Sequence, residues 1–118
     1  MRFFSHVRPP NPDDAFAALW TRDGAKCFSA IQKYTSYEKE SHTVRTTFRS
    51  FGATIRTEMI VLPRAIFFDI SAPFVKARGQ WTLRCGVITL EQTVSCPFYA
   101  VPIIRRCVKK TLKDLVRI

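Results

Sequence analysis

The sequence predicts an α+β fold in which a curved antiparallel β-sheet packs against a basic C-terminal helix. Through the middle of the chain, apolar residues alternate with polar ones, which is typical of strands with one buried face. Near the C-terminus, the apolar residues recur with a helical period instead. The chain has 118 residues, of which 47% are hydrophobic and 13% aromatic, and this is enough for one core. We therefore expect a single domain that spans residues 1–118.

A short strand and a short helix are predicted at the N-terminus. Residues 1–7 contain a pair of phenylalanines and lead to a pair of prolines, which suits a strand that runs into a turn. Asn11 or Asp13 can cap a helix over residues 14–20, and acidic residues in a first turn favour the helix dipole. An Asp-Gly pair then ends this helix.

A second short helix is predicted over residues 25–34. Phe28, Ile31 and Tyr34 recur there at three-residue spacing, which would place them on one helical face. The polar stretch over residues 36–41 is interpreted as a connection, because beyond it the period changes from helical to alternating.

The centre of the chain is predicted to be an antiparallel meander. Its segments alternate apolar and polar residues with the two-residue period of a half-buried strand. The connections between them are too short for helical crossovers, so neighbouring strands must run in opposite directions. The predicted strands are residues 43–51, 54–62, 65–72, 80–85 and 87–95.

The C-terminal helix, from Pro102 to Leu115, is the clearest element of the sequence. Proline is tolerated in the first turn of a helix, where its missing amide hydrogen is not needed. An apolar stripe that includes Ile104, Val108 and Leu112 should pack on the sheet. The opposite side has Asp114 as its only acid, and its basic residues are Arg105, Arg106, Lys109, Lys110, Lys113 and Arg117.

The charge of the chain favours an anionic partner. The formal net charge is +10, and such a field attracts an acidic protein surface, anionic lipid or RNA. We expect the six basic residues of the C-terminal helix to make this contact, because basic side chains one turn apart can meet successive anionic groups. The alternative is that this side of the helix is only solvated.

The sequence shows no motif for a metal, a cofactor or catalysis. Its four cysteines are far apart and lack a C-x-x-C pair, so we interpret them as buried free thiols rather than metal ligands, with disulfides as the alternative that an even number permits. Asp69 and Glu91 could act as an acid and a base if they faced one cavity, but solvent exposure or an ion pair with arginine is the expected state. We assign no catalytic residue. No apolar run is long enough to predict a membrane span.

Two segments of the predicted sheet have a distinctive sequence. Residues 62–69 (LPRAIFFD) combine a prolyl turn with a hydrophobic strand, and residues 74–83 (FVKARGQWTL) place Gly79 two positions before Trp81. With these segments, the order of the elements resembles the START-like or helix-grip superfamily, and in particular its polyketide-cyclase and coenzyme-Q-binding branch, whose members often carry such features. The resemblance covers about residues 43–118. It implies a sheet wrapped around the final helix, often with an apolar cavity for a lipid, quinone or pigment.

The resemblance also implies a site. Met59, Phe68, Trp81 and Leu83 would face the helix and would contact a hydrophobic small molecule if a void is present, whereas in a solid interior they are core residues. The first hypothesis is a non-enzymatic START-like domain that binds such a molecule or serves as a docking module. The alternative is a structural accessory subunit of a large organellar assembly, such as a ribosome or an energy-converting membrane complex. A cyclase-type enzyme ranks last. We expect an organellar interior, in a mitochondrion or plastid, with the cytoplasm as the alternative.

Overall fold

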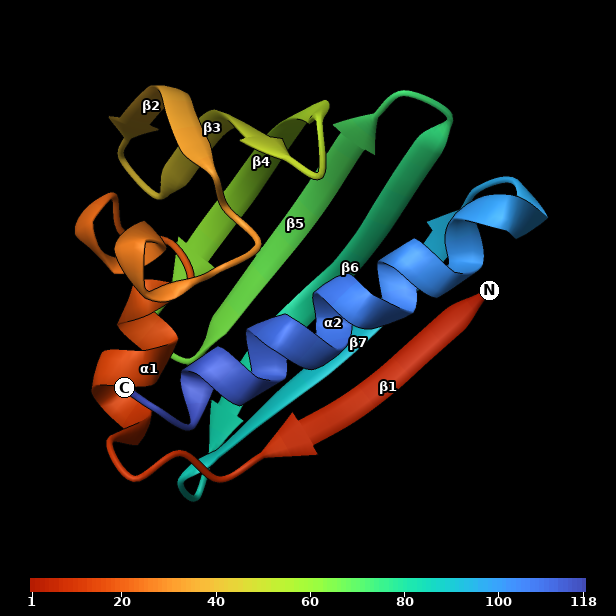
Figure 1. Cartoon of the computed structure of the whole chain (residues 1–118). Coiled ribbons are helices and arrows are strands. Elements are labelled where there is room, and N and C mark those ends of the chain that lie inside the picture. The colour runs from red at the N-terminus through yellow and green to blue at the C-terminus, as the bar shows by residue number, and fades with distance from the viewer.

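The computed structural model describes residues 1–118. It confirms an antiparallel sheet of seven strands that curves around the C-terminal helix (Figure 1). The strand order is β1-β7-β6-β5-β4-β3-β2, so the first strand of the chain pairs with the last. The strands are β1 (Arg2–Val7), β2 (Lys33–Glu40), β3 (Thr43–Ser50), β4 (Ala53–Leu62), β5 (Ala65–Ala72), β6 (Val75–Arg84) and β7 (Val87–Ser95).

Helical segments cover one face and one end of this sheet. Helix α2 (Val101–Leu115) lies along the inner face, while α1 (Pro12–Ala18) sits near the C-terminal end of α2 (Figure 1). Two short 3-10 segments, η1 (Asp23–Cys27) and η2 (Phe98–Ala100), precede β2 and α2. The predicted C-terminal helix and the predicted strands of the meander are confirmed, although β6 begins at Val75, before the predicted start at residue 80.

The predicted helix over residues 25–34 and the predicted connection over 36–41 are wrong. The structure has η1 and then strand β2 there. A bulge between Tyr34 and Ser36 interrupts the pairing of β2 with β3, and bulges break the two-residue alternation. Tyr34 and Tyr37 consequently both pack toward the core side, although they are three positions apart. In the sequence, this three-residue spacing resembles that of a helix. As an edge strand, β2 also carries charged residues that protect its open side.

The predicted cap of α1 takes a different form. Asn11 occupies the N-cap position, but its side chain makes no capping hydrogen bond. Its amide nitrogen instead donates to the carbonyl oxygen of Ile118 at 2.8 Å. This contact joins the start of α1 to the C-terminus and closes that end of the molecule.

The solid part of the core lies at the α1 end of the sheet. Val44, Ile66, Ile88 and Leu115 are completely buried there. Gly79 lets β6 and β7 approach closely, since a β-carbon at this position would lie 2.6 Å from the β-carbon of Gln92. The other end of the inner face is less densely filled, and the candidate site lies there.

Candidate functional site

A cavity of about 420 Å³ lies between α2 and the inner face of the sheet. Strands β3 to β7 form one wall through their inward-pointing alternate residues, and α2 forms the opposite wall. The segment that leads from α1 to β2 closes one side. The central lining residues are Phe48, Ile55, Thr57, Met59, Phe68, Ile70, Ala77, Trp81, Gln92, Val94, Ile104, Cys107 and Val108.

The cavity follows from a change in side-chain size along the strands. Toward α1, the inner face carries Phe68 on β5 and Leu83 on β6, both of which are buried in the core. Toward the opposite end, the same two strands carry Ala72 and Ala77. Cys107 faces this region from α2 and is also small. These side chains cannot fill the space that the curved sheet leaves under the helix, so a void remains.

The wall of the cavity is largely apolar and carries no Asp, Glu, His, Lys or Arg. Its polar groups are few: hydroxyls such as Thr57 and Thr111, and the amide of Gln92. The hydroxyl of Thr111 donates to the carbonyl oxygen of Cys107 at 2.9 Å, and the hydroxyl of Thr57 bonds to that of Thr46. The Gln92 amide, which is mostly buried, therefore offers both a donor and an acceptor to a ligand.

The titratable groups of the wall are Tyr34 and Cys107. Burial raises the pKa of Tyr34, and the neighbouring Tyr37 raises it further. Burial also raises the pKa of Cys107, although Lys110 and Arg106 oppose this. Both groups are consequently protonated at neutral pH. They can donate hydrogen bonds, but the thiol is not an activated nucleophile.

Three of the four predicted ligand residues line this cavity. Met59, Phe68 and Trp81 face it from β4, β5 and β6. Leu83 does not, because it lies further along β6 in the solid core, where it is 5% exposed. The polar lining groups were not predicted. Gln92 could have been found, since it shares the inner-face alternation of Leu90 and Val94 on β7.

Five of the six predicted basic residues lie on the outward side of α2, and Arg117 lies just after its end. Arg105, Arg106, Lys109, Lys113 and Arg117 are exposed, and Lys110 is half-buried with its ammonium 5.4 Å from the ring centre of Phe51. Asp114, which was predicted to be on this side, is instead buried. Its carboxylate accepts hydrogen bonds from the backbone amide and the hydroxyl of Ser29, at 2.9 and 3.1 Å. The charged residues on the exposed side of the helix are therefore all basic.

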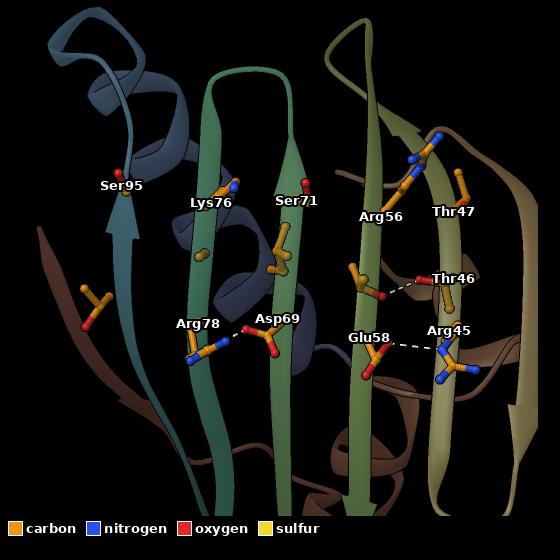
Figure 2. Close-up of a pocket in the computed structure, with 14 residues that line it drawn as sticks. Arg45, Thr46, Thr47, Arg56, Glu58, Asp69, Ser71, Lys76, Arg78 and Ser95 are labelled. Carbon is orange, nitrogen blue, oxygen red and sulfur yellow. Dashed lines mark hydrogen bonds and ion pairs between the residues drawn. The ribbon is translucent and has the colours of Figure 1, made fainter.

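A second, polar hollow of about 800 Å³ lies on the outer face of the sheet (Figure 2). Two ion pairs cross it, Arg45 with Glu58 at 3.1 Å and Arg78 with Asp69 at 2.7 Å. Their four side chains are more than half exposed. Arg56 and Lys76 add two exposed cations that have no ion-pair partner. All of these charges are in contact with solvent, which weakens their interaction with a ligand, so the hollow is a weaker candidate than the cavity.

The expected state of the two candidate acids is confirmed. Asp69 pairs with Arg78, and Glu91 pairs with Arg2 at 3.1 Å. Both carboxylates lie on the outer face, so they do not meet in the cavity as an acid and a base.

The four cysteines carry free thiols. Cys27 and Cys85 are exposed, which corrects the expectation of buried thiols for these two. No three His, Cys, Asp or Glu side chains are grouped so that they could hold a metal ion. None of the helices combines the length and the apolar character that crossing a membrane requires.

No protein-family model and no curated protein matches this chain by sequence. Solved structures do match. The di-domain aromatase/cyclase StfQ from the steffimycin biosynthetic pathway superposes with a TM-score of 0.73 at 16% identity, over 98% of this chain and 48% of StfQ. The protein TTHA0849 from Thermus thermophilus gives 0.67 at 14% identity, over 99% and 91% of the two chains. The Zhui aromatase/cyclase from a Streptomyces species gives 0.62 at 19% identity, over 98% and 90%.

This chain thus spans about half the length of StfQ. Two of these three structures are named as aromatase/cyclases, so the fold is one that enzymes use. This finding contradicts the prediction that the protein is not an enzyme, which rested on the lack of a convergent acid and base. The likeness in architecture extends over nearly the whole chain, and we conclude that the protein has the START-like helix-grip fold.

Proposed function

We propose that this protein binds a neutral, largely apolar small molecule in the cavity between α2 and the sheet. The observation that supports this is the composition of the wall, which has no charged side chain. A ligand carboxylate or amine buried there would lose its hydration without gaining a partner, at a high cost in free energy. The volume of about 420 Å³ lies within the range of about 300–1,000 Å³ that is typical of small-molecule sites.

The polar groups of the wall favour a ligand with hydrogen-bond acceptors. Tyr34 and Cys107 are protonated at neutral pH, and Gln92 adds an amide donor. Trp81 and Phe48 offer flat apolar surfaces on the same wall. We therefore propose a flat molecule that carries one or a few carbonyl or hydroxyl oxygens.

The names of StfQ and Zhui, both aromatase/cyclases, support a substrate that is converted to a ring-containing product. For such a substrate, the wall of this cavity can hold an apolar chain in a folded shape and polarise a carbonyl group through hydrogen bonds. Positioning and hydrogen bonding of this kind lower the barrier of a reaction between two parts of one molecule. These are the contributions that Tyr34, Gln92 and Cys107 could make.

A binding measurement with Nile red, which is neutral, flat and carries a carbonyl group, tests the proposal. The wild-type chain should bind the dye. Ala77→Phe should weaken binding about tenfold or more, because the new ring fills a space on the inner wall. Thr93→Phe is the matched control, since Thr93 is exposed on the outer face of β7. Equal affinities of Ala77→Phe and Thr93→Phe would refute the site.

A competition experiment tests whether the ligand is neutral. Methyl decanoate should displace Nile red better than decanoate does, because only the carboxylate loses its hydration in an uncharged wall. Equal competition by the ester and the acid would refute this part of the proposal. Maleimide labelling of the wild-type chain gives a further test that needs no substitution. Bound dye should slow the labelling of Cys107, whereas the rate of labelling of the exposed Cys27 should be unchanged.

A further inference from the structure

Exposed apolar side chains gather around one end of the cavity. The β3–β4 turn, the β5–β6 turn and the η2–α2 segment all lie at the end opposite α1 (Figure 1). Phe98 is 88% exposed and Phe74 is 80% exposed, which is extreme for residues of this type. We call this group the aromatic rim and define it as Phe51, Phe74, Phe98, Tyr99 and Ile103.

The rim is continuous with the cavity. Phe51 and Ile103 belong to its lining as well as to the surface. Phe74 stands between Pro73 and Val75, and both of these line the cavity. The exposed aromatic side chains therefore surround an end at which the apolar interior approaches the surface.

Two rim residues have a backbone conformation that does not suit them. Phe51 has φ 50° and Phe74 has φ 64°, in the left-handed region that favours glycine and asparagine. The turns at the opposite end of the sheet also contain residues with positive φ, but there they are Ser41 and Cys85, which have small side chains. A large apolar side chain that is exposed at such a position gains little packing in the free protein. Backbone strain and exposed apolar surface together indicate a binding surface.

The surroundings of the rim are positively charged. Its residues come from three stretches, 41–57, 70–90 and 92–113, and none of these contains an Asp or Glu. Lys76 follows Phe74 closely, Arg105 and Arg106 follow Ile103, and Lys110 lies over the ring of Phe51. This end of the molecule therefore attracts anionic surfaces.

We propose that the aromatic rim inserts into the surface of an anionic phospholipid bilayer. Phe, Tyr and Ile side chains are favourable in the interfacial region, and Lys and Arg beside them bind anionic headgroups. The rim residues come from two turns and the η2–α2 segment, and such a dispersed set suits a fluid surface. Single-stranded nucleic acid would instead require aromatic faces along one charged groove.

This arrangement places the rim end of the cavity against the bilayer, so that an apolar ligand can move between the two without crossing water. That last step rests on the proposed function. The contact with the bilayer does not, because it depends only on the rim and its basic neighbours.

Vesicle co-sedimentation of the full chain tests the proposal. The protein should bind vesicles of phosphatidylcholine and phosphatidylserine more tightly than vesicles of phosphatidylcholine alone. Phe74→Asn combined with Phe98→Ser should lower binding about tenfold or more. Because asparagine tolerates a left-handed backbone, Phe74→Asn should not destabilise the fold. Arg105→Gln with Arg106→Gln should lower binding roughly tenfold to thirtyfold. Each basic side chain near an anionic membrane surface contributes about 1 kcal/mol to binding, and the double variant removes two of them.

Matched controls separate the rim from the rest of the surface. Phe4→Ser removes a phenylalanine that is 70% exposed on the outer face of β1. Arg64→Gln with Arg84→Gln removes the same charge as the arginine pair, from exposed positions at the α1 end of the sheet. Both controls should bind vesicles nearly as the wild type does. If they lose as much affinity as the rim variants, or if the rim variants bind like the wild type, the proposal is wrong.

Two further outcomes distinguish the proposals from each other. If the chain binds single-stranded RNA through the rim and does not bind anionic vesicles, the partner is a nucleic acid and the bilayer proposal fails. The rim variants should still bind Nile red in solution. Vesicle binding without Nile red binding would refute the proposed ligand site and leave the membrane contact standing.

Discussion

Truncation of two apolar residues of α2 should have very different costs, and the comparison tests whether the cavity exists in solution. Leu115, at the C-terminal end of the helix, is completely buried in the core cluster. Ile104, near the N-terminal end, is half-buried and lines the cavity. Both belong to one apolar stripe of the same helix, and the helix propensities of leucine and isoleucine differ by only roughly a few tenths of a kcal/mol, so packing decides the comparison.

The expected magnitudes follow from the packing. Leu115→Ala should cost about 2–5 kcal/mol, because it removes buried methyl groups and leaves a new void in a solid region. Ile104→Ala should cost about 1 kcal/mol, roughly half of what burial of a complete side chain contributes, since a void is already present beside it. In a chain of this size 1 kcal/mol corresponds to about 4 °C in melting temperature. The two shifts should therefore be about 8–20 °C and about 4 °C.

Urea denaturation followed by tryptophan fluorescence would measure both free energies of unfolding. Val116→Ala is a useful control, because Val116 is 40% exposed and its truncation should cost little. A loss for Ile104→Ala as large as that for Leu115→Ala would mean that α2 packs tightly along its whole length. The cavity would then be absent in solution.

Two other predictions concern the sheet and the half-buried tyrosines of β2. Gly79→Ala should destabilise the fold by a few kcal/mol, because a β-carbon there would overlap the carbonyl oxygen of Glu91; an unchanged melting temperature would show that β7 can move away. The free energy of unfolding should fall as the pH rises above about 10, since burial raises the pKa values of Tyr34 and Tyr37 above 10.0. Between the unfolded and folded pKa values the unfolded chain binds fewer protons, so alkali favours unfolding. Urea midpoints should show a smaller decline for Tyr34→Phe than for the wild type, and equal declines would contradict the assignment.

The sequence alone predicted the helices and strands whose apolar residues recur at a regular spacing. In β5, Ile66, Phe68 and Ile70 alternate with outward residues, and in α2 a helical stripe faces a basic side. Each pattern is local, because the direction of a side chain in a strand or helix depends only on its position in that element. The antiparallel order followed from the short connections between such segments.

The sequence did not reveal β2, because its pattern depends on a partner. Tyr34 and Tyr37 reach the inner side only through the bulge opposite β3, and the remaining residues of this edge strand are polar. Asp114 is a similar case. By helical position it is one more polar residue near the end of α2, but Ser29, its hydrogen-bond partner, is 85 positions away in the chain.

The tertiary structure alone decided which inner-face residues line the cavity. Met59, Phe68, Trp81 and Leu83 have the same alternation in the sequence, yet Leu83 belongs to the solid core and the other three line the cavity. The difference arises because a void is the part of the space under the curved sheet that side chains do not fill. These side chains come from β3 to β7 and from α2. That curvature and the position of α2 are properties of the whole fold, set by contacts such as the close approach of β7 to Gly79, and no local pattern carries them.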